Sequence, residues 1–292
     1  MTEIETLIEG TNVVLPDYAN HTFSQDRIEK QTYRTFVSGT GGTWDEGGAS
    51  QLDFLKKRGL KPNQRFVDIG CGALRAGRHL VDYLDEGNYY GVDANRDLLQ
   101  IGYDRELTDD QRGRLPVANL RANDRFNVDF GVKFDMAIAQ SVFTHVSLNH
   151  MRLCLHRLAR VMRPGGVFYA SYVDQPESAP IDHIFQKGKG GRTYFYEKNV
   201  FWYHLSDMEW AAEGEPWSVR FVGEYGSAQQ QLMVAYTRLS DARHQSKISR
   251  EKETALRRAA VNDQIKAGGA ASVLLRARRK AATILTPYGG RV

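Results

Sequence analysis

The chain has 292 residues, of which 41% are hydrophobic and 25% are charged, so wholesale disorder is excluded and a globular protein is expected. Its two cysteines, Cys71 and Cys154, exclude a disulfide scaffold and a four-cysteine zinc site. The net charge of +4 is uneven. Residues 241–292 carry 12 Lys and Arg against 4 Asp and Glu, whereas the remainder carries 27 against 31. An anionic partner is therefore expected at the basic end.

Strands and helices are predicted to alternate along most of the chain. A first helix over 49–58 is expected to end at Gly59. The predicted strands are 65–69, 89–93, 118–121, 134–140 and 167–173, with helices at 75–84, 96–106 and 149–162. Strands 219–224 and 232–236 are close enough in sequence to form an antiparallel pair. The order predicts an α/β fold: a doubly wound, seven-stranded, mostly parallel sheet with a C-terminal antiparallel strand pair and a helical tail.

A glycine turn follows the first of these strands. Gly70 and Gly72 allow the backbone to turn sharply and to approach a ligand closely. Asp93 ends the next strand, 23 residues after Gly70. A carboxylate at that place accepts hydrogen bonds from both ribose hydroxyls of a nucleoside cofactor.

The residues around this turn distinguish between cofactors. Arg75 stands where a dinucleotide fingerprint requires a third glycine, and no Lys-Ser/Thr pair follows as in a phosphate-binding P-loop. The Asp68 carboxylate would repel a phosphate and attract an ammonium group. The electrostatics therefore favour S-adenosylmethionine, which carries an α-amino group and a sulfonium, over NAD.

Four motifs in order resemble those of class I S-adenosylmethionine-dependent methyltransferases, a Rossmann-like family, over residues 45–238. They are Asp68-Ile69-Gly70-Cys71-Gly72, Gly91-Val92-Asp93, Phe134-Asp135 and Arg163-Pro164-Gly165-Gly166. The resemblance implies S-adenosylmethionine as cofactor and a set of cofactor-binding residues. These are Asp68, Gly70, Cys71 and Gly72 for the methionine part, Asp93 and Ala94 for the ribose, Asn123 and Asp124 beside the adenine, and Gln140 and Ser141 near the transferred methyl group. The chain departs from the family pattern at Leu74, where a third glycine is frequent.

His145 is the candidate general base. It lies just beyond the carboxyl end of the strand at 134–140, and imidazole is neutral near pH 7, as a base for a hydroxyl acceptor must be. The alternative is a histidine that packs against the following helix. The segment from about 174 to 204 is long and rich in aromatic residues, so a substrate wall or an aromatic packing cluster is expected. Candidate substrate contacts in it are His183, Tyr194, Tyr196 and His204.

Other methylation chemistries lack their characteristic residues. Gln140-Ser141-Val142-Phe143 differs from the Asn/Asp-Pro-Pro-Tyr of exocyclic-amine nucleic-acid methylases. Gln140 also stands where a metal-dependent catechol-type enzyme would place an acid, so no catalytic metal is predicted.

The two ends of the chain are assigned separate roles. Residues 1–44 are expected to form an extension that covers the cofactor cleft, and 239–292 a basic helical tail. A helix over 273–288 would carry Val273 and Tyr288 on one apolar face opposite several arginines, as in peripheral membrane or anionic-partner binding. A homodimer contact is the alternative. The absence of a signal-peptide pattern or an apolar run of about 18 residues predicts a cytoplasmic protein, and the tail helix would allow peripheral contact with the inner membrane face.

The function predicted from these observations is S-adenosylmethionine-dependent O-methylation of a sugar, glycoconjugate or other small molecule, with His145 as base. The alternative is an RNA or protein methyltransferase that docks through its basic tail, although nucleic acid is the less favoured partner because the body of the chain is acidic. A further alternative is a scaffold that binds the cofactor without catalysis.

Overall fold

The computed structural model describes residues 18, 20–38, 44–175, 180, 182, 184–187, 192–195, 200–224, 231–259 and 262. The chain divides into two compact units, 1–240 and 241–292. In the second unit, residues 241–259 form a helix. Among the described residues, no helix is long and apolar enough to cross a membrane.

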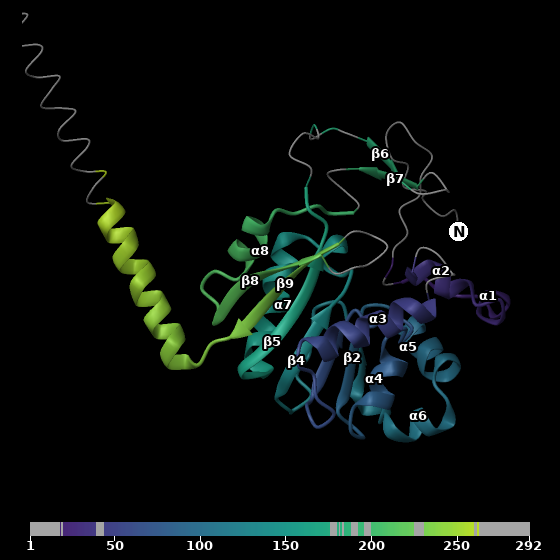
Figure 1. Ribbon diagram of the computed structural model, residues 1–292. Coiled ribbons are helices and arrows are strands. Elements are labelled where there is room, and N and C mark those ends of the chain that lie inside the picture. Colours follow the sequence, from purple (N-terminus) through teal and green to yellow (C-terminus); the bar gives the residue numbers. More distant parts are fainter. Residues whose placement is uncertain are drawn as a thin grey trace, which may run out of the picture. The chain divides into compact units, whose positions relative to one another are not determined.

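A seven-stranded sheet forms the centre of the first unit, with strand order β3-β2-β1-β4-β5-β9-β8 (Figure 1). Strands β3, β2, β1, β4 and β5 pair in parallel, and β9 is antiparallel to both β5 and β8. The strands are β1 (Phe66–Ile69), β2 (Tyr89–Asp93), β3 (Leu120–Ala122), β4 (Phe134–Ala139), β5 (Met162–Tyr172), β8 (Trp217–Glu224) and β9 (Leu232–Arg238). This sheet confirms the predicted α/β fold and its antiparallel C-terminal pair.

Helices connect the strands and precede the sheet. They are α1 (Gln25–Glu29), α2 (Thr32–Ser38), α3 (Trp44–Lys57), α4 (Gly77–Tyr83), α5 (Arg96–Ile101), α6 (Asp109–Arg114), α7 (Leu148–Val161) and α8 (Leu205–Ala211). A π-helix, η2 (Gly102–Glu106), continues α5, and two 3₁₀ turns, η3 (Val117–Asn119) and η4 (Phe143–His145), precede β3 and follow β4.

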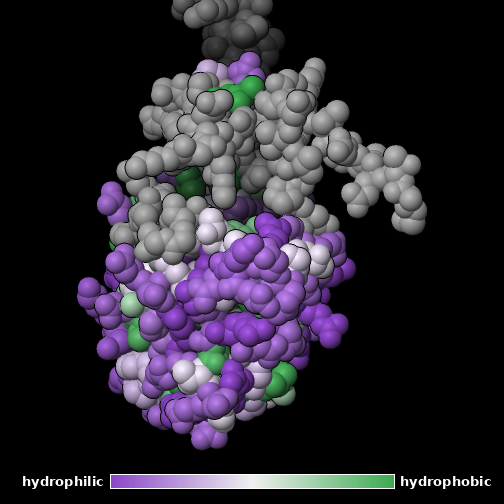
Figure 2. Space-filling view, turned by 90° about the vertical axis from the view of Figure 1, so that its right-hand side faces the viewer, coloured by the Kyte–Doolittle hydropathy of each residue, from purple (hydrophilic) through white to green (hydrophobic). Residues whose placement is uncertain are grey.

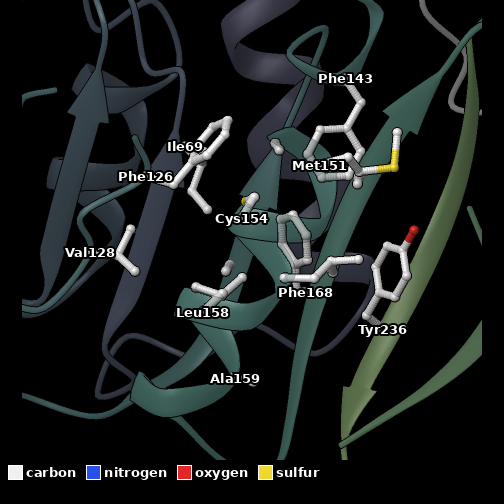
Figure 3. Close-up of a cluster of buried hydrophobic side chains, with 14 of the residues drawn as sticks. Ile69, Phe126, Val128, Phe143, Met151, Cys154, Leu158, Ala159, Phe168 and Tyr236 are labelled. Atoms are coloured by element: carbon white, nitrogen blue, oxygen red, sulfur yellow. The ribbon is translucent and has the colours of Figure 1, made fainter. Parts of the chain in front are cut away.

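The sheet is buried on both faces because successive side chains of a strand point to opposite sides. In β4, Ala137 and Ala139 belong to one buried cluster, and Met136 and Ile138 belong to another. Helix α7 covers the first face, where its buried Cys154 and other side chains approach strands β5 and β9 (Figure 3). Helices α3 and α4 contribute to the second cluster.

Several elements differ from those predicted. The helix predicted over 49–58 begins earlier, at Trp44, and the helix predicted over 96–106 becomes a π-helix after Ile101. Strand β5 begins at Met162 rather than 167, because the turn at 163–166 forms an irregularity within the strand. The hairpin β6 (Ile184–Lys187) with β7 (Arg192–Phe195), and helices α6 and α8, were not predicted.

The face of the first unit that carries α1, α2, α5 and α6 is mostly hydrophilic. Where described residues appear in that view, hydrophobic side chains are scattered among charged and polar ones (Figure 2). Scattered apolar residues are normal on protein surfaces and do not indicate an interface.

Candidate active site

The carboxyl ends of the central strands define the candidate site. Strand β1 lies between β2 and β4. From β1 the next two strands of the chain, β2 and β3, are added on one side of the sheet, and β4 and β5 are added on the other. Ligands of doubly wound sheets bind at this topological switch point. The loops that follow β1, β2 and β4 contain most of the predicted cofactor-binding residues.

The glycine loop after β1 adopts backbone conformations that favour glycine. Gly70 has φ +72° and Gly72 has φ +53°. A Cβ at Gly70 would overlap Cγ2 of Val142, which follows β4. Gly70 is solvent-exposed, while Gly72 is buried. Because Gly70 has no side chain, its backbone is accessible at the switch point, and Val142 packs against it.

Asp93 is joined to the glycine loop by hydrogen bonds. Its Oδ2 accepts from the Gly72 N–H at 2.8 Å, and its Oδ1 accepts from the Asn95 N–H at 2.8 Å. The residue is only 3% exposed. Burial raises the pKa of its carboxyl to about 6, although these N–H donors oppose the rise. The carboxylate is thus held in place at the end of β2, where a ribose-binding acid is expected.

A second buried acid lies beneath the loop. Asp68, 3% exposed, accepts a hydrogen bond from the Tyr89 hydroxyl at 3.2 Å. Burial raises the Asp68 pKa to about 7, and the nearby Asp93 charge adds to this, while Tyr89 opposes it. Burial also raises the pKa of the Cys71 thiol, which therefore stays protonated and unreactive at neutral pH.

Residues of the N-terminal extension contact this region directly. The Tyr18 hydroxyl lies 3.4 Å from Asp93 Oδ2. The Asn95 side-chain amide donates to the carbonyl oxygens of Tyr18 and His21, at 2.6 and 2.9 Å. Val37 is the side chain nearest to the position of a Cβ on Gly72. These contacts support the proposal that the extension covers the cofactor cleft.

Buried Glu106 anchors the same extension to the sheet domain. It accepts two hydrogen bonds from Arg34, one from Tyr33 at 2.5 Å and one from Trp44 at 3.2 Å. The Glu106 side chain is fully buried and that of Arg34 is 23% exposed. Burial, with this hydrogen bond, raises the pKa of Tyr33 to about 12. Sequence patterns gave no signal for the cluster, since Glu106 lies more than sixty residues from its N-terminal partners.

The candidate adenine residues follow β3. The Asn123 N–H donates to the Asp93 carbonyl at 2.8 Å, which places this loop beside the end of β2. The Asn123 side chain accepts from the Asn127 N–H at 2.6 Å and so closes a local turn. Asp124 is exposed, and Ala94 contributes an N–H to the Asp93 carboxylate.

The turn after β4 is held by polar groups that sequence reasoning missed. Ser141 has φ +58°, and its N–H donates to the Ser171 hydroxyl at 2.7 Å. The buried Gln231 contacts both serines: its amide donates to Ser141 Oγ at 2.8 Å and accepts from Ser171 Oγ at 2.6 Å. Gln140 is half-buried immediately before this turn.

His145 ends the η4 turn that follows. The residue has exposed surface, and partial desolvation of its imidazole by neighbouring protein lowers its pKa from the ordinary value. The Phe201 N–H donates to the Thr144 carbonyl at 2.7 Å, and the Tyr203 hydroxyl donates to the Val146 carbonyl at 2.6 Å. The segment at 201–203 therefore lies alongside η4.

The four candidate substrate contacts are spread along the segment before α8. His204 precedes α8, where its N–H donates to Asp207 at 2.8 Å. Tyr194 lies in β7, which pairs with β6, while His183 and Tyr196 lie outside the described residues. Within the described part of the chain, no group of three His, Cys, Asp or Glu residues is arranged to hold a metal ion.

The fold is an α/β fold, and the candidate cofactor site lies at the carboxyl ends of β1 and β2. Residues 67–168 match the family described as "Methyltransferase domain". With the strand order and the four motifs, this match supports a methyltransferase domain of the class I S-adenosylmethionine-dependent type in this part of the chain. The protein is an enzyme whose methyl donor is S-adenosylmethionine. The exposed Gly70 backbone and the buried Asp93 fit that donor.

Solved methyltransferases share the fold at low sequence identity. The sugar N-methyltransferase KedS8 from Streptoalloteichus sp. is 15% identical, with 80% of this chain and 100% of that chain covered and a TM-score of 0.52. CalS10, an amino pentose methyltransferase from Micromonospora echinaspora, is 17% identical, with coverage of 75% and 100% and a TM-score of 0.51. Magnesium protoporphyrin IX methyltransferase from Synechocystis is 16% identical, with coverage of 73% and 97% and a TM-score of 0.52. At such identities the likeness shows the fold alone.

Proposed function

We propose that this enzyme methylates a hydroxyl group of a sugar, glycoconjugate or similar small molecule, with His145 as the general base. The observation that carries the proposal is the position of His145. It ends the η4 turn directly after β4, on the edge of the sheet that also carries Gly70 and Asp93. In parallel sheets the carboxyl ends of neighbouring strands lie at one edge, so the base and the cofactor loop face the same side.

The lowered pKa of His145 suits a base. An imidazole whose pKa lies below the ordinary value is unprotonated at neutral pH and can accept a proton. S-adenosylmethionine supplies, when bound, a methyl group activated by the sulfonium charge. The acceptor oxygen forms a bond to the methyl carbon as the carbon–sulfur bond breaks, and the hydroxyl proton passes to His145 and then to solvent.

The segment at 200–204 supports the turn that carries His145. Phe201 and Tyr203 are tied to η4 by the hydrogen bonds described above, and the Tyr203 N–H also donates to the Val173 carbonyl after β5. Tyr203 is only 8% exposed and belongs to the core, with Phe201 packed against it, so these two side chains support the turn that carries His145 and do not themselves contact the acceptor. His204, His183, Tyr194 and Tyr196 remain the proposed acceptor contacts, of which His183 and Tyr196 lie outside the described residues.

Proteins of similar fold support a sugar acceptor, since KedS8 is named a sugar N-methyltransferase and CalS10 an amino pentose methyltransferase. These two names also suggest the nitrogen of a sugar amine as an alternative acceptor atom. His145 would then accept the proton of an ammonium group before attack, so the same base serves both acceptors.

The test is transfer of a labelled methyl group from S-adenosylmethionine into a fractionated extract of the source cell, followed by defined sugar nucleotides with and without an amino group. Label on oxygen in the carbohydrate or glycolipid fraction is the expected result. Label on a sugar amine would show that the acceptor atom is nitrogen and not oxygen, while the acceptor would still be a sugar. Label in RNA or protein would overturn the proposal and favour docking through the basic tail, in which case transfer should fall steeply with salt.

A further inference from the structure

The turn after β4 has an unusual backbone conformation at Ser141. A φ of +58° places Ser141 in the left-handed region, which is unfavourable for a residue with a Cβ. Non-glycine residues stay there only when their surroundings hold them, and such positions cluster at functional sites. The groups that hydrogen-bond to Ser141 are therefore candidates for residues that keep this turn in its functional conformation.

Three hydrogen-bonding groups hold this turn. The Ser171 hydroxyl accepts from the Ser141 N–H at 2.7 Å, and the Gln231 amide donates to Ser141 Oγ at 2.8 Å. Ser171 in turn donates to Gln231 Oε1 at 2.6 Å, which closes the network. The Thr144 hydroxyl donates to the Ser141 carbonyl at 3.2 Å. Backbone donor, side chain and backbone acceptor of Ser141 are all engaged.

The network is buried and comes from distant strands. Ser171 is fully buried near the end of β5, and Gln231, 4% exposed, immediately precedes β9. Register pairs Ser171 with Met233 and Tyr172 with Leu232, so Gln231 is carried to the carboxyl edge of the sheet. Burial of an amide and a hydroxyl is costly unless they are paired, and here they are paired with the turn after β4.

The next residue connects the turn to the cofactor loop. Val142 packs against Gly70, where it occupies the space that a Cβ would fill. A shift of the Ser141 backbone would move Val142 away from or into the glycine loop. Because a packed site has little free volume, a displacement of Val142 would be passed on to the backbone of the glycine loop.

We propose that Ser171 and Gln231 are positioning residues of the cofactor site: they hold Ser141 in its left-handed conformation and so seat Val142 against Gly70. They act through Ser141 and Val142. The inference depends on S-adenosylmethionine as the cofactor and is independent of the acceptor class.

The test is the affinity for S-adenosylhomocysteine, measured by titration calorimetry on the full chain. Gln231→Leu is expected to weaken binding about tenfold or more, which corresponds to about 1.4 kcal/mol. Ser141→Gly serves as the reference background, because glycine adopts the left-handed conformation without the network, and in that background Gln231→Leu should change the affinity by less than about threefold. The double variant Gln231→Leu/Ser141→Gly should regain most of the affinity that Gln231→Leu loses. A purely structural role of Gln231 predicts no such rescue.

Gln100→Leu, an exposed position on α5, is the matched control and should bind as the parent does. If Gln231→Leu does not fold, Ser171→Ala with and without Ser141→Gly makes the same comparison. Unchanged affinity in Gln231→Leu, or a double variant as weak as the single one, would overturn the proposal. Hydrogen exchange of the peptide that contains Ser141 should rise in Gln231→Leu and fall again in the double variant.

Discussion

The N–H of Gly72 donates to Oδ2 of Asp93 over 2.8 Å, so the loop after β1 and the acid after β2 form one hydrogen-bonded unit. Both residues are buried, and Asp93 receives a second N–H from Asn95. The geometry of the candidate cofactor site is thus fixed by contacts within the protein. Such prior organisation reduces the cost of ordering on binding.

Asp68→Asn should flatten the dependence of stability on pH. The folded-state pKa of Asp68 is raised to about 7, above the ordinary value, so its stabilising contribution is full below the unfolded pKa of about 3.9 and is lost as pH rises through about 7. We expect the free energy of unfolding of the parent to fall between about pH 4 and about pH 7, and that of the variant to fall less. Urea unfolding without cofactor measures both. Exposed Asp85→Asn is the control, and a parallel pH dependence in parent and Asp68→Asn would contradict the assignment.

Glu106→Ala should destabilise the first unit by about 3 kcal/mol or more, because it leaves Arg34 without its bidentate partner and Tyr33 and Trp44 without an acceptor. Glu106→Gln should lower the free energy of unfolding by less than Glu106→Ala, since the amide retains one carbonyl acceptor. The exposed Glu29→Ala is the control. A loss below about 1 kcal/mol in chemical unfolding would show that the cluster does not anchor the N-terminal helices.

Two helical glycines should respond in opposite directions to alanine. A Cβ at Gly102 would lie 2.6 Å from the carbonyl carbon of Ala73, so Gly102→Ala should cost about 1–3 kcal/mol and weaken cofactor binding through the glycine loop. A Cβ at Gly113 meets nothing within 4 Å, so Gly113→Ala in α6 should stabilise by about 0.5–1 kcal/mol. Thermal unfolding of both variants measures the contrast, and equal effects would argue against the contact between η2 and the loop.

His145→Ala should lower kcat about 100-fold with the acceptor found by the labelling experiment, while affinity for S-adenosylhomocysteine stays within about twofold. Since the pKa of His145 is lowered, activity of the parent should decline only below about pH 6.5. His156→Ala, an exposed histidine on α7, is the control. Unchanged kcat in His145→Ala would remove His145 from the mechanism.

The parts of the fold that are determined by local sequence pattern could be predicted from the sequence. Strands β1, β2 and β4 are short apolar runs, and the glycine turn and Asp93 follow them at characteristic spacing. The π-helix after Ile101 and the early start of β5 were missed, because tertiary packing and a strand irregularity decide them. Helix α6 carries a capping box at Thr108 and Gln111 that could have indicated it.

The candidate site was predictable only where residues lie close in sequence. Ser171 and Gln231 are 60 residues apart, and the Ser141 turn lies 30 residues before Ser171. Single-sequence patterns cannot pair such positions, since no periodicity links a buried serine of one strand to a glutamine that precedes another. The assignments of Asn123 and Asp124 remain predictions from the resemblance, and those of the substrate residues remain predictions from the long aromatic segment at about 174–204.

The most direct test of the account is calorimetric titration of S-adenosylhomocysteine into the parent and Asp93→Asn, with Asp85→Asn as control. We predict one site per chain in the parent and a loss of at least about tenfold in affinity in Asp93→Asn, because the variant lacks the carboxylate that receives the ribose hydroxyls. The control should match the parent. Failure of the parent to bind, or equal affinity in Asp93→Asn, would contradict the cofactor site described for this enzyme.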